Sequence, residues 1–492
     1  MHKALLIDEL IQLLFDICLE DSKGTLCYLA RCCKAWKDPA LDRIWRRLPS
    51  AAPLLALVQD SENAEPTTPV FTSYANRVRH VTHQQASSCD VPSFSCNVSD
   101  YEQTLKTYLS KLASVRVDYS STGTLHSHLM ISPRLQRMEL DLGFRRSTRT
   151  SSNALHASFL LKEAAAIASL ERLSVRGITC PAALDNISSV KTLRALCLHV
   201  SCPSMTTALI SIGTLPALTE LNIHTGHVSA DAFTQAFEDK RLNRSSFFPS
   251  LTTLKIRASP QVLEALASLL AQHTLKDLSI EAEQPVGPPS SWLSAFQAIS
   301  SNLSDTLDAL TIEHSIDSIE LEQADDTLPP AKSCHFTLEN LRPLSNLPLR
   351  RFVLDSLLPP DMTDSDIVEL AKWWPRLEHL ELGHPDALNS VDEQWHIKAT
   401  PSSLVSLASG CRNLERLVLS IDASHDVSRS TSLRNHPLSH LTIGSRLPPH
   451  QSVEEFVRLS FPSLTEFHPG LEDLHADCWR NVCSSVVTNY DN

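Results

Sequence analysis

One short phrase, Leu-x-x-Leu-x-Leu, returns along the chain and limits what the chain can fold into. From Leu135 onward it occurs eleven times, with Ile, Val, Met or Phe at some positions, and a shorter fragment, LTEF, follows at Leu464. Successive starts are 35, 23, 25, 33, 24, 32, 42, 28, 37, 24 and 26 residues apart. Such periods predict a repeat architecture in which each unit packs on its neighbours. The phrases read LQRMEL, LERLSV, LRALCL, LTELNI, LTTLKI, LKDLSI, LDALTI, LRRFVL, LEHLEL, LERLVL and LSHLTI.

Each phrase predicts one short strand. Its last two apolar residues are two apart, as on one face of a strand, and the first precedes them by three, as at an entering turn. Between phrases the apolar spacing becomes helical. Since strand and helix alternate, we expect neighbouring strands to be parallel. The clearest helical sets are Leu263, Leu266, Leu269 and Leu270, and Ile367, Leu370, Ala371 and Trp374.

The segment from Leu135 to Phe467 resembles leucine-rich repeats. Several of its spacings fall in the range of about 20 to 29 residues that this family uses, and the longer ones require insertions. The Asn or Cys that usually stands ninth is absent, because these positions hold Ile178, Ser201, Gly226 and similar residues. We therefore predict an α/β fold, an irregular solenoid with a parallel sheet and an interrupted polar ladder.

Three short helical patterns occupy the first fifty residues. Lys23-Gly24 predicts the break between the first two, and Asp38 followed by Pro39 predicts an N-cap and first helical position. We expect the three apolar faces to bury one another and to leave Ile7, Ile11, Phe15, Cys18 and Trp36 uncovered. An external protein would then cover them. The three faces are Leu10, Leu13, Leu14 and Ile17; Leu26, Leu29, Ala30 and Cys33; and Leu41, Ile44, Trp45 and Leu48.

The text "LLIDELIQLLFDICL…TLCYLARCCKAWKDPALDRIWRRL" resembles an F-box. This resemblance implies docking on a Skp-type adaptor and, through it, on a cullin-RING ubiquitin ligase. Asp8 stands where the family pattern has Pro, and a carboxylate there suits a helix start. By position, the resemblance implies that the adaptor-binding residues are Ile7, Asp8, Leu10, Ile11, Leu14, Ile17, Cys33, Trp36 and Trp45.

These patterns predict four segments. Residues 1–49 form the three-helix F-box, and residues 50–130 form a linker with a possible first irregular repeat, including a strand through Val78 and Val81. Residues 131–470 form the solenoid, and residues 471–492 a C-terminal cap or tail. We expect loops at 84–100 and insertions from Glu283 and from Glu322.

The residues between the apolar strand positions would line an exposed surface that binds a protein substrate. Basic residues come first and acidic ones later, which suggests a charge progression that would orient an extended partner. The alternative is an ordinary solvated face, since strand charges also oppose aggregation. The candidates are Arg172, Arg176, His199, Lys255, Arg257, Asp277, Glu281, Glu313, Asp355 and Glu381.

Composition and charge argue against some classes of function and some cellular locations. The formal net charge of −13 argues against a nucleic-acid partner. The longest apolar stretches are interrupted by charges, so we expect neither a membrane helix nor a signal peptide. Thirteen scattered cysteines without a secretory signal favour a reducing compartment, the cytoplasm or nucleus.

The chain contains none of the common catalytic or ligand-binding motifs. Phosphate-binding glycine loops, HExxH, CxxC and GxSxG are all missing from the sequence. We therefore predict no catalytic residue, metal or cofactor. The F-box resemblance implies a non-enzymatic substrate receptor of a ubiquitin ligase. Two alternatives stay open. One is a leucine-rich-repeat scaffold whose amino-terminal helices only cap the array, or which uses the adaptor outside a ligase; the other is a hydrolase assembled in the loops.

Overall fold

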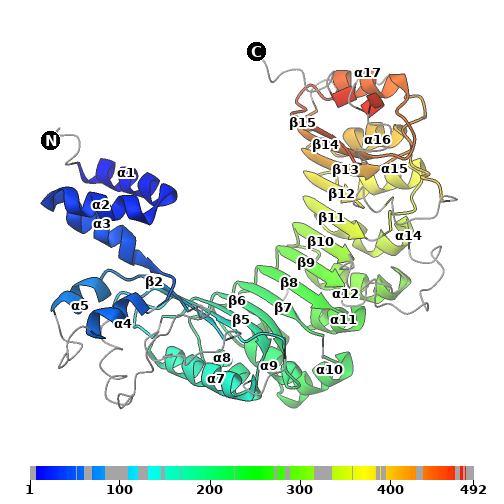
Figure 1. Ribbon diagram of the computed structural model, residues 1–492. Coiled ribbons are helices and arrows are strands. Elements are labelled where there is room, and N and C mark those ends of the chain that lie inside the picture. Colours follow the sequence, from blue (N-terminus) through cyan, green and yellow to red (C-terminus); the bar gives the residue numbers. More distant parts are fainter. Residues whose placement is uncertain are drawn as a thin grey trace. The chain divides into compact units, whose positions relative to one another are not determined.

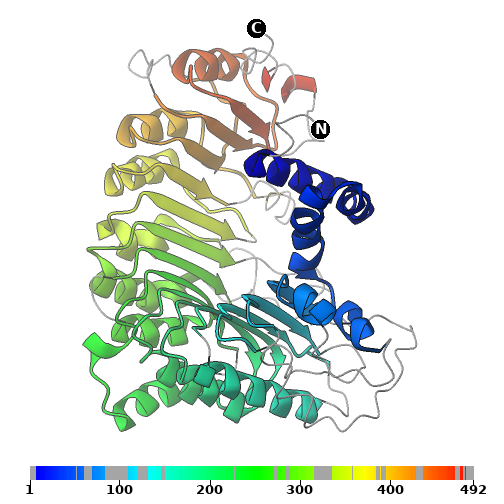
Figure 2. The same ribbon diagram turned by 90° about the vertical axis from the view of Figure 1, so that its left-hand side faces the viewer.

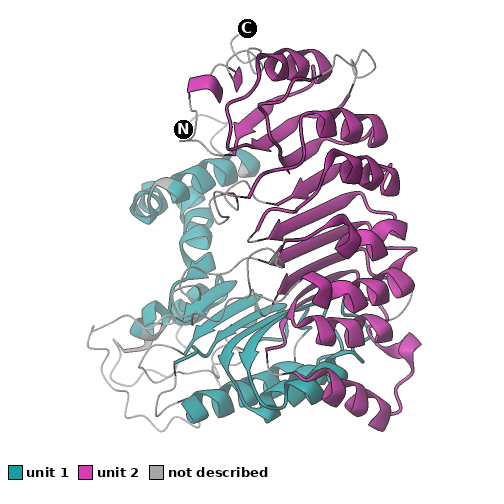
Figure 3. Cartoon of the chain, turned by 90° about the vertical axis from the view of Figure 1, so that its right-hand side faces the viewer, with its two compact units in different colours: residues 1–218 teal, residues 219–492 magenta. Residues whose placement is uncertain are grey.

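The fold is described from a computed structural model of the chain. It describes residues 7–50, 52–59, 69–83, 109–119, 131–145, 150–167, 169–226, 228–270, 274–282, 289–314, 335–356, 358–383, 388, 395–427, 436–470, 477–479 and 482–483. Two compact units divide the chain, residues 1–218 and residues 219–492 (Figure 3). The expected loop at 84–100 and the insertion from Glu322 lie outside the described residues, as do residues 283–288 of the insertion from Glu283.

The first unit begins with three helices, α1 (Asp8–Asp21), α2 (Lys23–Cys32) and α3 (Lys34–Arg46). The Ser22 hydroxyl caps α2 by accepting a hydrogen bond from the Gly24 N–H at 3.0 Å, close to the predicted break. The predicted start of α3 at Asp38 is wrong. The Trp36 and Lys37 N–H groups both donate to the Cys33 carbonyl, at 3.3 and 3.2 Å, so the helix begins a turn earlier and Pro39 lies inside it.

A parallel sheet follows the helices in the first unit. Each strand pairs with the next one along the chain. Figure 1 shows helices α7 to α9 on one side of the strands; we call the other side the open face of the unit. The strands are β1 (Arg47–Leu48), β2 (His80–His83), β3 (Ser114–Asp118), β4 (Arg137–Asp141), β5 (Arg172–Ile178) and β6 (Ala195–Ser201). The helices are α4 (Ala52–Gln59), α5 (Pro69–Ala75), α7 (Thr150–Ile167), α8 (Pro181–Ser188) and α9 (Met205–Ile212).

The second unit repeats the same plan. Its strands are again parallel, each paired with the next, and helices cover one face of them (Figure 1). The strands are β7 (Glu220–His224), β8 (Thr253–Ala258), β9 (Asp277–Ala282), β10 (Ala309–His314), β11 (Arg351–Ser356), β12 (His379–Leu382), β13 (Arg416–Ser420), β14 (His440–Gly444) and β15 (Glu466–Pro469). The helices are α10 (Ala230–Asp239), α11 (Pro260–Leu269), α12 (Leu293–Leu303), α14 (Leu338–Leu341), α15 (Asp364–Trp373), α16 (Ser402–Gly410) and α17 (Gln451–Ser460).

The leucine phrases account for the strands from β4 to β15. All eleven phrases and the fragment at Leu464 end in a strand, and the first leucine of each phrase is buried. Both clear helical patterns correspond to real helices, α11 and α15. The α/β solenoid with parallel strands is therefore confirmed. Val81 lies in β2 as predicted, but Val78 precedes that strand, and β1 and β3 were not predicted.

A backbone ladder holds successive repeats in register. The carbonyl of the second residue in a phrase accepts two N–H groups from the next repeat. In the first unit the Gln136 carbonyl accepts from Glu171 and Arg172, both at 2.9 Å. In the second unit the Asp308 carbonyl accepts from Arg350 at 2.8 Å and Arg351 at 3.0 Å. Because the ladder uses only the main chain, register does not require the Asn or Cys missing from the ninth position.

Gly177 lies where β5 passes closest to the chain leaving β4. Its φ is +108°, and an added Cβ would lie 2.5 Å from the carbonyl oxygen of Gly143. We predict that Gly177→Ala lowers the free energy of unfolding of the first unit by about 2–4 kcal/mol, from backbone strain and steric overlap together. Urea unfolding followed by circular dichroism measures this change.

Gly24→Ala is the matched control. A Cβ at Gly24 would meet only the Ser22 side chain, at 3.2 Å, and alanine favours the helical conformation there. The unfolding midpoint should stay the same or rise slightly. A Gly177→Ala protein as stable as this control would contradict the proposed close packing of β4 and β5.

Candidate protein-docking site

The three amino-terminal helices have a small core of their own. Ile11, Phe15, Leu26 and Ala40 are buried in it. The Trp36 ring packs edge-on against Phe15, with ring centroids 6.0 Å apart. The residues packed around this cluster all come from α1, α2 and α3 as well. The helices therefore bury their inner side against one another.

This arrangement reverses the predicted orientation of α1. Ile11 is 5% exposed and Phe15 0%, although both were expected to stay uncovered. Leu13 and Ile17, which were expected in the shared interface, are 61% and 60% exposed. The error arises because α1 is apolar around much of its circumference, so helical spacing fits either side.

The outer side of α1 is an exposed apolar surface. Its residues follow helical spacing and therefore share one side of the helix. Single exposed apolar residues are ordinary, but a contiguous patch of this kind is typical of a protein-binding surface. We call Ile7, Leu10, Leu13, Leu14 and Ile17 the α1 apolar face; all five are exposed.

The other residues implied by the F-box resemblance do not all lie on this face. Asp8 is the first residue of α1. Cys33 is half-buried at the start of α3, and Trp36 packs into the helical core with Ile11. The Trp45 ring packs against Tyr74, with centroids 4.6 Å apart, so it joins α3 to α5. The structure thus brings together Ile7, Leu10, Leu14 and Ile17, and adds Leu13.

Ion pairs fix the helices to one another and to the sheet. Arg43 of α3 pairs with Asp16 of α1 at 2.7 Å. Arg77, which precedes β2, pairs with Asp38 at 2.5 Å and also contacts Asp42. Burial lowers the pKa of Arg77, but the hydrogen bonds to both carboxylates outweigh it and hold that pKa above its usual value. Figure 2 shows α3 leading from α1 and α2 to the strands.

The predicted substrate-binding residues all occupy open-face positions of their strands. In the first unit, Arg172 and Arg176 are exposed and His199 is half-buried. The candidates in the second unit are half-buried; they are Lys255, Arg257, Asp277, Glu281, Glu313, Asp355 and Glu381. Alternation along the strands therefore placed these side chains on the expected side.

The predicted charge progression does not hold within the second unit. Lys255 pairs with Glu313 at 3.4 Å, and Arg257 pairs with Glu281 at 3.2 Å, so basic and acidic candidates neutralise one another. Glu381 is also paired: a hydrogen bond from the His379 ring, at 2.6 Å, holds the pKa of this carboxyl below its usual range. The Lys255 and Arg257 ion pairs therefore join different strands, and the basic and acidic candidates do not form separate regions.

The open-face arginines absent from the candidates include Arg47 and Arg137. Both are the first residues of their strands. The sequence pattern could have predicted Arg137, because it occupies the same place in its phrase as Arg172 does in the next. Arg47 has no such signal, since β1 lies outside the phrase pattern.

The described residues contain neither a metal-binding cluster nor a membrane-spanning helix. No group of three or more His, Cys, Asp or Glu side chains in them is arranged to hold a metal ion. In the same residues, no helix is long and apolar enough to cross a membrane.

Comparison with known proteins gives only distant likenesses. No family model matches the chain, and neither does any curated protein. Among solved structures, the Rad7 and Elc1 complex from yeast has a chain that is 14% identical, with a TM-score of 0.38, over 88% of this chain and 92% of that one. The mouse RP105/MD-1 complex has one that is 12% identical, with a TM-score of 0.34, over 82% and 61%. The fold assignment therefore rests on the strand ladder itself.

The two sides of α1 should respond differently to truncation. We predict that Phe15→Ala destabilises the three helices by about 3 kcal/mol or more, because it removes a fully buried ring. Amide hydrogen exchange of α2 and α3 measures this local loss. Leu13→Ala is the control and should change the same protection by about 0.5 kcal/mol at most. Equal effects of the two substitutions would show that α1 is oriented differently.

Proposed function

We propose that the chain is the substrate receptor of a Skp-cullin-F-box ubiquitin ligase, with a Skp-type adaptor covering the α1 apolar face. The observation that carries this proposal is the exposure of that face on helices that already have a complete core. The order of the F-box-like motifs in residues 1–49 supports the same assignment. An adaptor would remove these side chains from water, at about 1.5–3 kcal/mol for each fully buried leucine or isoleucine.

The architecture of the first unit supports separate roles for the helices, which would bind the adaptor, and the strands, which would bind the substrate. The Arg77 ion pair joins α3 to the segment that enters β2, and the Trp45–Tyr74 contact joins α3 to α5. A partner on the α1 apolar face would therefore be linked to the residues of the open face through ordered structure. In this function the chain performs no bond chemistry; it holds a substrate protein near the ubiquitin-carrying enzyme, so that transfer becomes effectively intramolecular.

Capping of the repeats alone accounts less well for α1. A capping helix would turn its apolar side toward the repeats it covers. Leu10 and Ile17 instead remain 47% and 60% exposed. A scaffold that binds the adaptor outside a ligase would use the same face, so association with the cullin separates it from the ligase receptor.

Charge placed on the α1 apolar face should weaken adaptor binding. We predict that Leu10→Glu and Ile17→Glu in the full chain each weaken binding of a purified Skp-type adaptor by about tenfold or more, because each loses apolar burial and buries a carboxylate. Isothermal titration calorimetry gives the dissociation constants. Cullin capture from the same mixtures should fall in parallel.

Leu155→Glu is the matched control, since Leu155 is 63% exposed on α7, away from α1. It should bind the adaptor with unchanged affinity. Full adaptor affinity in the Leu10→Glu and Ile17→Glu proteins would refute the docking role. Adaptor binding without any cullin capture would instead support the scaffold.

A further inference from the structure

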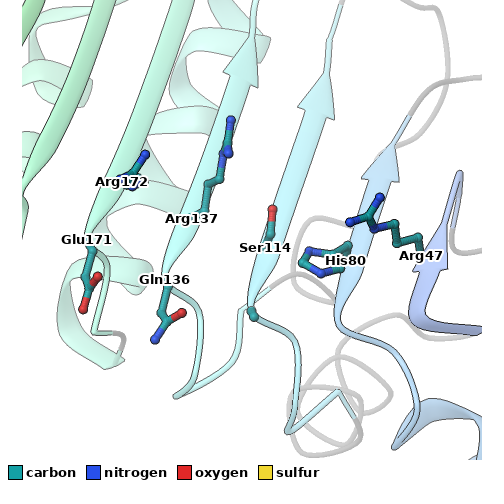
Figure 4. A pocket seen from close by; sticks show the side chains of 8 residues that line it. Arg47, His80, Ser114, Gln136, Arg137, Glu171 and Arg172 are labelled. Atoms are coloured by element: carbon teal, nitrogen blue, oxygen red, sulfur yellow. The ribbon is translucent and has the colours of Figure 1, made fainter. Parts of the chain in front are cut away.

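A hollow of about 450 Å³ lies on the first unit, at the starts of its strands. Arg47, His80, Ser114, Arg137 and Arg172 line it, from β1 to β5 in order (Figure 4). We call these five residues the arginine row. Glu171 also lines the hollow, but Figure 4 shows its side chain extending in the opposite direction from that of Arg172.

The strand register makes these residues a true row. These residues are register partners on successive parallel strands. Arg47 is opposite His80, His80 opposite Ser114, Ser114 opposite Arg137, and Arg137 opposite Arg172. Neighbouring strands are about 4.8 Å apart, so the row spans roughly 19 Å. That length matches about six residues of an extended peptide, at roughly 3.3 Å each.

The row carries excess positive charge. No carboxylate among the described residues pairs with Arg47 or Arg172. Arg137 contacts Glu139 at 2.6 Å, but Arg116 shares this one carboxylate at 3.7 Å. The guanidinium groups of Arg116 and Arg137 therefore share the single carboxylate of Glu139. This local excess of positive charge contrasts with the formal net charge of −13 of the whole chain.

The pKa of the His80 imidazole reflects burial and the positive charges around it. Burial lowers the pKa of its imidazole, and the positive charges of Arg47, Arg46, Arg79 and Arg137 lower it further. With its pKa lowered in this way, the ring is neutral near pH 7 and adds no charge to the row. His80 and Ser114 are thus uncharged polar residues that line the hollow between Arg47 and Arg137.

The backbone holds the row in place before any ligand binds. The N–H groups of Ser114, Arg137 and Arg172 each donate to a carbonyl of the preceding repeat, at 3.0, 3.1 and 2.9 Å. Strand starts fixed in this way lose little further backbone freedom on binding. Preorganisation of this kind favours affinity.

We propose that the arginine row binds an extended acidic segment, rich in Asp or Glu, of the protein that the chain recruits. This inference rests on the proposed function, because it names the substrate class that the open face takes. Guanidinium groups bind carboxylates through two parallel hydrogen bonds. Single exposed pairs contribute little, so recognition requires several carboxylates along the row. A nucleic acid fits less well because its phosphates would continue beyond the row, where the rest of the acidic chain repels them.

The test uses the full chain and a fluorescein-labelled peptide of about six consecutive glutamates, the number that the length of the row accommodates. Fluorescence anisotropy measures its affinity. The same peptide with glutamine at every position serves as the uncharged probe, and a glutamine peptide with one phosphoserine tests a single phosphate. We expect the glutamate peptide to bind at least about tenfold more tightly than either.

The double variant Arg47→Glu with Arg172→Glu should weaken the glutamate peptide by about tenfold or more. Lys162→Glu with Lys191→Glu changes net charge equally at exposed positions outside the row and should leave affinity within about twofold. Equal binding of the glutamate and glutamine peptides would overturn the proposal. Equal loss in both double variants would also overturn it, as would preference for the phosphoserine peptide.

Adaptor affinity of the same proteins separates this inference from the proposed function. The Arg47→Glu with Arg172→Glu protein should bind the adaptor normally. If the glutamate peptide binds no more tightly than the glutamine peptide while adaptor affinity is normal, only the acidic-segment inference is refuted. If the Leu10→Glu and Ile17→Glu proteins keep full adaptor affinity while the glutamate peptide binds as expected, only the proposed ligase role is refuted.

Discussion

In-register pairing of parallel strands is the constraint on which the rest of this structure depends. Each phrase buries its leucines toward the helices, and its second carbonyl receives two N–H groups from the next repeat. A slip of one residue would turn every buried leucine of a strand to the open face. The same register sets which side chains meet across strands, including the arginine row and the Lys255–Glu313 pair.

The amino-terminal helices bury their apolar side chains in a different way from the repeats. Three short helices cannot bury every apolar side of themselves, and α1 is apolar on more than one side. Phe15 and Ile11 complete the inner core, and the outer residues stay in contact with water. Arg43, Arg77 and Trp45 hold the helices through α3, which leaves the outer side of α1 available. An exposed apolar helix on an ordered support is well suited to receive a partner protein.

Sequence patterns predicted the strands well because the phrase carries both period and burial. The strand β3 escaped because valines replace leucines in its phrase, Leu112, Val115 and Val117, although all three are buried in the same way. The orientation of α1 could not be predicted, since Leu10 and Ile11 belong to two equally regular apolar stripes. Cross-strand charge pairs were out of reach too, because pairing partners such as Lys255 and Glu313 are far apart in the sequence and only register brings them together.

Site-resolved carbene footprinting of the full chain, with and without a purified Skp-type adaptor, tests the central claim most directly. The account predicts strong labelling of Leu13 and Ile17 in the free chain and weak labelling of Ile11 and Phe15. Adding the adaptor should protect the α1 apolar face and leave the strands of the second unit labelled as before. Strong labelling of Phe15 in the free chain, or unchanged labelling of Leu13 and Ile17 once the adaptor is bound, would contradict it.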